Sequence, residues 1–109
     1  MSGEYEEIVS QIGIPALLEQ SAEECLELGH ILLKFSRKLR NENPTPVTVD
    51  DLKEGLTEEA GDVVNCLEAL IDCGLISPMS MDMVRSKKIP RWKKRLKRML
   101  TENKQKGDK

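Results

Sequence analysis

Apolar residues recur at helical spacing along most of the chain. Tyr5, Ile8, Val9 and Ile12 stand at i, i+3, i+4 and i+7, which predicts a short amphipathic helix over residues 4–12. Gly13 should end it, and Pro15 suits the first position of the next helix. The following pattern predicts a long helix over residues 16–40, with apolar side chains on about half of its circumference.

A loop and a second long helix come next. Residues 41–49 contain two prolines and several turn-forming residues, which predicts a loop within the domain. Thr48 or Asp50 can cap the helix that follows, predicted over residues 50–73 and ended by Gly74.

The C-terminal quarter begins with Ser77 and Pro78, a typical helix start. We expect a third segment there, kinked or restarted at Pro90, and a frayed basic tail over residues 101–109. The predicted fold is therefore all-α, with two long helices and shorter N- and C-terminal helices.

The chain of 109 residues has room for one domain, which we expect to span residues 1–109. Only 3% of the residues are aromatic, which argues against a large self-sufficient core. We therefore expect an oligomer, either a homodimer or a homotetramer. Neither a membrane span nor a secretion signal is evident, which favours the cytoplasm. The three cysteines lack a C-x-x-C pair and are expected to be reduced.

The net charge of −2 conceals two oppositely charged regions. Residues 1–84 carry 5 basic and 17 acidic side chains, a balance of −12. Residues 85–109 carry 12 basic and 2 acidic side chains, a balance of +10. Acidic chemistry is therefore expected in the first region and contacts with anions in the second.

Two acidic motifs of the same form lie in the two long helices. Residues 23–27 read acid-acid-x-x-acid, and residues 58–62 repeat this pattern. The second and last acids of each motif stand about one turn apart on one face of a helix. If the helices pack together, four carboxylates converge, and a hard divalent cation with oxygen ligands would offset their repulsion.

The acids differ in their relation to the apolar faces. Glu24 borders the apolar arc of its helix. On the helical wheel Glu27 lies about 60° from Glu24. Glu59 falls inside the apolar sector of the second helix, and Asp62 lies at its margin. An ionised carboxylate in an apolar sector costs several kcal/mol unless a cation or hydrogen bonds compensate it. Glu59 is therefore the strongest candidate for a functional acid.

The doubled motif resembles that of the MazG-like, all-α nucleoside triphosphate pyrophosphohydrolases over about residues 17–76. The resemblance implies hydrolysis of an NTP or dNTP to the monophosphate and pyrophosphate, with Mg²⁺ as cofactor and Mn²⁺ able to substitute. It also implies that the two long helices are antiparallel and form a helical bundle with a second subunit. It assigns the metal to Glu24, Glu27, Glu59 and Asp62. An outer acid, Glu23 or Glu58, is the candidate proton acceptor for the attacking water.

Candidate substrate-binding residues lie around this motif and in the basic region. Lys34 falls about 20° from Glu27 on the helical wheel and can reach a phosphate. Asn65 lies beside Asp62, and Trp92 could stack on a base, although its spacing also suits a core or interface position. Further candidates for contact with the triphosphate are Lys87, Lys88 and Arg91.

Two other functions compete with this interpretation. A di-iron carboxylate bundle would use Glu27-x-x-His30, but it requires a second Glu-x-x-His unit, and the chain has one histidine. A non-enzymatic helical dimer could instead bind nucleic acid or an anionic surface through its basic C-terminal segment. That alternative leaves Glu59 in an apolar sector unexplained, so we do not expect nucleic acid to be the partner.

Overall fold

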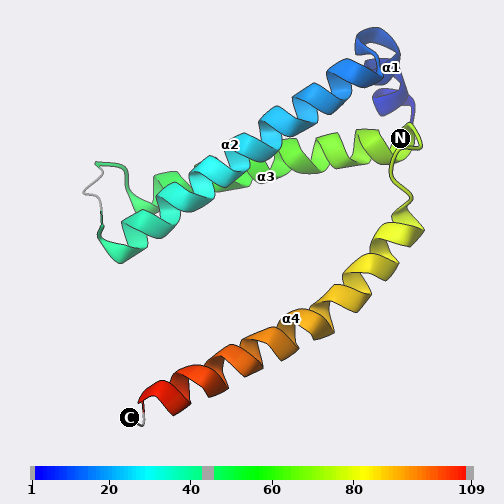
Figure 1. The fold of residues 1–109 in the computed structure, drawn as a ribbon. Coiled ribbons are helices and arrows are strands. Elements are labelled where there is room, and N and C mark those ends of the chain that lie inside the picture. Colours follow the sequence, from blue (N-terminus) through cyan, green and yellow to red (C-terminus); the bar gives the residue numbers. More distant parts are fainter. Residues whose placement is uncertain (1, 43–45, 108–109) are drawn as a thin grey trace. The chain divides into compact units, whose positions relative to one another are not determined.

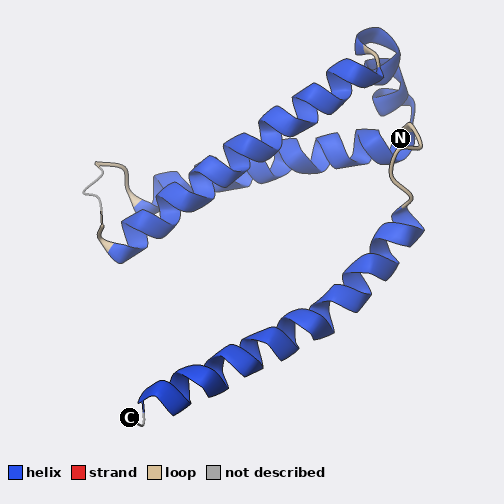
Figure 2. Ribbon diagram, viewed as in Figure 1, coloured by secondary structure: helices blue, strands red, loops and turns tan. Residues whose placement is uncertain are grey.

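The computed structural model describes residues 2–42 and 46–107, which form four α-helices joined by short connections (Figures 1 and 2). They are α1 (Ser2–Ile12), α2 (Ile14–Arg40), α3 (Val49–Asp72) and α4 (Pro78–Gly107). The described residues contain no strand. The all-α prediction is therefore confirmed.

Local sequence signals set the ends of α1 and α2. Gly13 separates the two helices and has φ 85° and ψ 162°, a conformation that a residue with a Cβ rarely adopts. Pro15 occupies the first turn of α2, where the amide hydrogen it lacks would have no helical partner. At the other end, Asn41 adopts the left-handed conformation. Its backbone N–H donates to the carbonyl oxygens of Arg37 and Lys38 in the last turn of α2.

The start of α3 has a capping box. The Thr48 hydroxyl accepts a hydrogen bond from the Asp51 backbone N–H at 3.1 Å, and the Asp51 carboxylate accepts one from the Thr48 N–H at 3.3 Å. Of the two predicted caps, the structure therefore selects Thr48. Gly74 follows the helix with φ 84°, as the predicted ending requires.

The chain divides into two compact units, residues 1–75 and 76–109. In the first unit α2 and α3 run antiparallel and pack along each other (Figure 1). Helix α1 lies across the end where α2 begins and α3 finishes, and it contacts both. The second unit consists mainly of α4.

The core of the first unit is small. Among the residues of this unit that the structure describes, four apolar side chains are buried, namely Leu17, Leu52, Ala69 and Leu70. Many other apolar side chains of α2 remain open to solvent, and Leu26, Leu33 and Leu39 are 74%, 62% and 65% exposed. The low aromatic content thus produces the limited core that it predicted.

Gly55 lets α3 approach α2 closely. A Cβ at this position would lie 2.5 Å from Cδ1 of Ile31 on α2. Any larger residue would force Ile31 to turn or the helices to separate. Ile31 lies on α2 one turn beyond Glu27, so this contact helps to set the helix spacing next to the acidic motifs.

Helix α4 differs from the sequence-based expectation in two ways. It has 30 residues, more than α2 with 27 or α3 with 24, so the prediction of a shorter C-terminal helix is wrong. It continues through Pro90 without a restart and extends to Gly107, where a frayed tail was expected. Pro90 lies on an exposed stretch, where water can satisfy the carbonyl that loses its partner, and the Lys, Gln and Glu residues near the end favour a helix. Residues 108 and 109 of the predicted tail lie outside the described part.

Among the described helices, none combines the length and the apolar character that a membrane crossing requires. The thiols of Cys25, Cys66 and Cys73 are free, as the absence of a C-x-x-C pair predicted.

Candidate functional site

Three of the predicted metal ligands converge where α2 and α3 face each other. Glu24 and Glu27 come from α2 and Glu59 comes from α3, and one carboxylate oxygen of each lies within 4.8 Å of the others. We call these three residues the carboxylate cluster. Helical spacing places the first two on one face of α2, and antiparallel packing brings the third across from them.

Two oxygens of the carboxylate cluster are buried without a hydrogen-bond partner in the described residues. They are Oε2 of Glu24 and Oε2 of Glu59. Buried polar atoms are almost always paired in native proteins, so two such atoms in one place require an explanation. The other Glu24 oxygen, Oε1, accepts a hydrogen bond from Nε2 of Gln20 at 2.9 Å, which fixes the carboxylate on the surface of α2.

The pKa of both inner acids is raised. For Glu59, burial is the main cause of the higher pKa, and the negative charges of Glu27, Glu24 and Asp62 raise it further. For Glu24, burial again comes first, followed by Asp62 and Glu27, while the hydrogen bond from Gln20 lowers the pKa in part. The site is therefore short of positive charge.

Asp62 lies close enough for its charge to act on Glu24 and Glu59, but it is not one of the three acids in mutual contact. Its side chain is exposed. The two candidate proton acceptors, Glu23 and Glu58, are also exposed. The structure thus brings three of the four predicted ligands together and leaves the fourth at the edge.

The donor set of the carboxylate cluster fits a hard divalent cation. Its ligands are carboxylate oxygens without a sulfur or imidazole among them, and Mg²⁺ and Ca²⁺ prefer oxygen. The two unpartnered buried oxygens are the atoms that a cation would contact. His30, which the di-iron interpretation needs, is exposed and does not belong to the cluster.

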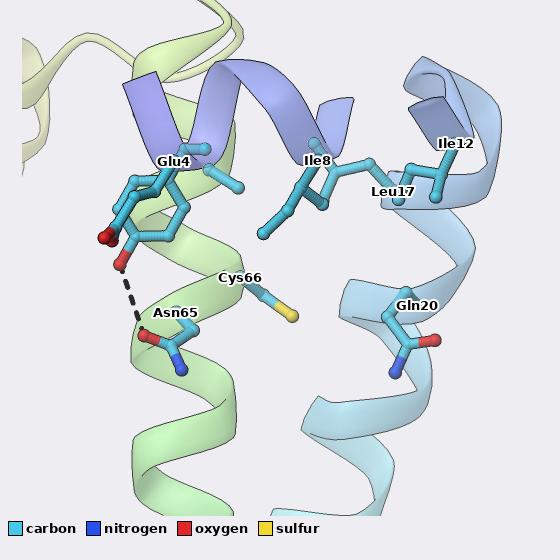
Figure 3. Close-up of a pocket in the computed structure, with 9 residues that line it drawn as sticks. Glu4, Ile8, Ile12, Leu17, Gln20, Asn65 and Cys66 are labelled. Carbon is cyan, nitrogen blue, oxygen red and sulfur yellow. Dashed lines mark hydrogen bonds between the residues drawn. The ribbon is translucent and has the colours of Figure 1, made fainter. Parts of the chain in front are cut away.

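A pocket lies beneath α1, and Gln20, the hydrogen-bond partner of Glu24, lines it (Figure 3). It has a volume of about 280 Å³ and is lined by residues of α1, α2 and α3. Its apolar wall is formed by Ile8, Ile12, Leu17 and Ala69. Its polar groups include Tyr5, Gln20 and Asn65, and the Tyr5 hydroxyl donates a hydrogen bond to Oδ1 of Asn65 at 3.2 Å.

The predicted substrate-binding residues fall in three places. Asn65 lines the pocket beneath α1, and Lys34 is half-buried on α2. The remaining four, all exposed on α4, are Lys87, Lys88, Arg91 and Trp92. The last three of these surround a hollow of about 320 Å³ together with Arg95.

Tyr5 and Gln20 were not predicted as site residues. A signal for Gln20 was present, because it precedes Glu24 by four residues and so stands one turn away on the same face. No local signal pointed to Tyr5, whose partner Asn65 is 60 residues away in the chain.

We compared the chain with protein-family models, curated proteins and solved structures, and none of the three comparisons gave a significant match.

Proposed function

We propose that this chain is a Mg²⁺-dependent pyrophosphohydrolase that cleaves a nucleoside triphosphate, NTP or dNTP, into the monophosphate and pyrophosphate. The doubled acidic motif and its resemblance to the MazG-like enzymes suggest the reaction. The observation that carries the proposal is the carboxylate cluster, in which three acids from two helices meet and two buried oxygens have no partner.

In this proposal Glu24, Glu27 and Glu59 hold Mg²⁺, and Asp62 completes the ligand set from the edge of the cluster. Mn²⁺ could occupy the same oxygen ligands. When bound, the metal would neutralise phosphate charge at the reacting centre. This chemistry does not require a serine, cysteine or histidine nucleophile.

The protein's own groups would position the substrate and accept a proton. As water attacks phosphorus and the anhydride bond between the α and β phosphates breaks, an exposed acid beside the cluster, Glu23 or Glu58, would take up the proton. Lys34 is the cation of the first unit that we assign to the phosphates. The basic groups of α4 that we assign to the same task are Lys87, Lys88 and Arg91, with Trp92 next to them.

We further propose that the active form is a homodimer or homotetramer in which a second copy completes the helical bundle. Support comes from the exposed leucines of α2, since a monomer with Leu26 and Leu33 more than half exposed leaves apolar area in water. In light scattering coupled to gel filtration, wild type should elute as an oligomer and Leu26→Lys/Leu33→Lys as a smaller species. A wild-type monomer would contradict this assembly.

Pyrophosphate release from ribo- and deoxyribonucleoside triphosphates, measured with and without Mg²⁺, tests the activity. Wild type should release pyrophosphate only with the metal. Glu59→Gln should reduce kcat/KM by about 100-fold or more, because even indirect partners of metal ligands contribute 10–100-fold. Asp62→Asn should have a smaller effect. Full activity of both folded variants would exclude this site assignment.

Helix α4 supports one other candidate function. Its basic residues surround exposed apolar side chains, among them Trp92 at 63% and Leu96 at 46% exposure, an arrangement typical of helices that bind anionic surfaces. Retention on anionic vesicles or DNA that weakens with salt, without pyrophosphate release from any nucleotide, would favour this function.

A further inference from the structure

The pocket beneath α1 and the carboxylate cluster are adjacent on both helices that form them. On α2, Gln20 lines the pocket and donates its hydrogen bond to Glu24. On α3, Asn65 lines the pocket and follows Asp62 by three residues. On α2 one helical turn of about 5.4 Å therefore separates the pocket from Glu24. On α3 the six residues from Glu59 to Asn65 rise by about 9 Å, with Asp62 between them. Both steps lead towards α1.

The size and lining of the pocket suit a small, flat, partly polar group. Its volume of about 280 Å³ is just below the range of about 300–1,000 Å³ that is typical of sites for drug-sized ligands. Four apolar side chains provide surface for the faces of a ring. Cys66 also points into this space from α3 (Figure 3).

Two amide groups that line the pocket are each oriented by one hydrogen bond. Oδ1 of Asn65 accepts a hydrogen bond from Tyr5, which leaves Nδ2 of Asn65 as a donor. Nε2 of Gln20 donates a hydrogen bond to Glu24, which leaves Oε1 of Gln20 as an acceptor. Neither remaining atom has a partner among the described residues. The two amides therefore offer one donor and one acceptor, and the carboxylate of Glu4 at the pocket adds further acceptor oxygens. The hydrogen-bonding edge of a nucleobase, which carries both donors and acceptors, can satisfy such a set.

We propose that this pocket binds the nucleobase of the substrate, so that the sugar spans the turn between pocket and cluster and the phosphates reach the acids. The inference depends on the proposed function and adds to it a base-binding site with Asn65 and Gln20 as its polar contacts. It also gives α1 a role in substrate selection, because Tyr5 and Ile8 belong to that helix.

The test compares a nucleotide with inorganic tripolyphosphate, which has the phosphates but no base. With Mg²⁺, wild type should hydrolyse nucleotides with a higher kcat/KM than tripolyphosphate. A non-hydrolysable nucleoside triphosphate, with a methylene group between the α and β phosphates, should raise Tm more than tripolyphosphate does. Ile8→Trp, which fills the pocket from α1, should reduce the preference for nucleotides by about ten-fold or more and remove the extra rise in Tm. Gln11→Trp is the matched control, since Gln11 is exposed on the same helix and does not line the pocket.

The outcomes separate the two proposals. If wild type prefers nucleotides and Ile8→Trp retains that preference, the base-binding site is wrong and the hydrolase stands. If tripolyphosphate and nucleotides behave alike in wild type, the base-binding site is again wrong. If neither compound is hydrolysed or bound, the proposed function fails and the pocket assignment fails with it.

Discussion

Gln20 donates a hydrogen bond to Glu24 at 2.9 Å, and through this bond one side chain belongs both to the pocket beneath α1 and to the support of the carboxylate cluster. A change of ligand in the pocket would therefore act directly on an acid of the cluster. If the pocket binds substrate and the cluster binds metal, as proposed, this contact within α2 would couple the two without any movement of helices.

Removal of the Glu59 charge should stabilise the metal-free protein. The same change should abolish metal binding. Glu59→Gln eliminates a half-buried negative charge that faces two other acids, so its Tm should exceed that of wild type in EDTA. At millimolar Mg²⁺ wild type should gain stability by ligand linkage and the variant should not. Glu68→Gln, at an exposed position of α3 outside the cluster, should leave both Tm values unchanged. A lower Tm for Glu59→Gln in EDTA would contradict this account.

The stability of the metal-free protein should depend on pH in a defined direction. The pKa values of Glu24 and Glu59 are raised above 4.5, so the folded state binds protons more tightly than the unfolded state. Their contribution to the unfolding free energy is complete below pH 4.5 and is lost as pH rises through the raised values. Urea titrations from pH 4 to 7 should show a steeper decline in wild type than in Glu24→Gln/Glu59→Gln. Parallel curves would indicate that these acids are not coupled to folding.

Two glycines of α3 should differ in their response to alanine. A Cβ at Gly61 meets nothing within 4 Å, so Gly61→Ala should add about 0.5–1 kcal/mol of stability through reduced backbone entropy in the unfolded chain. At Gly55 the new methyl would meet Ile31, so Gly55→Ala should be less stable than Gly61→Ala. Thermal unfolding measures the difference. Destabilisation by Gly61→Ala would reveal a neighbouring molecule on that face.

Loss of the capping box should weaken the start of α3. Thr48→Ala removes the hydroxyl that accepts from Asp51 and should cost about 1 kcal/mol. The matched control is Thr57→Ala, where the hydroxyl donates to the Lys53 carbonyl within the helix, and alanine should be neutral or stabilising there. Urea unfolding of both variants checks the contrast. Equal effects would mean that capping does not stabilise α3.

Local signals predicted most of the fold. Gly13, Pro15, Thr48 and Gly74 mark helix ends because their backbone preferences act within a few residues. The length of α4 was not predicted, since a proline in an exposed helix reduces stability without fixing where the helix must stop.

The acids of the site could be predicted from their position at the edge of an apolar face. The helical wheels place Glu24 at the margin of the apolar face of α2 and Glu59 inside the apolar face of α3. In the structure each of these two side chains has a buried carboxylate oxygen. The pocket could not be predicted in the same way, because it forms only when α1 lies across α2 and α3. Helix periodicity says which residues of α1 face inward, but it does not say how much space remains beneath them.

A single residue, Gly13, joins α1 to α2 through a backbone conformation that glycine adopts readily. If α1 forms a wall of the proposed base-binding pocket, this junction sets the angle of that wall. The acids of the carboxylate cluster lie on α2 and α3 and do not belong to α1. Evolution could then change which nucleotide is accepted by altering one junction residue or the inward face of one short helix. The part of the molecule that selects the substrate would thus be free to diverge while the part that performs the chemistry is preserved.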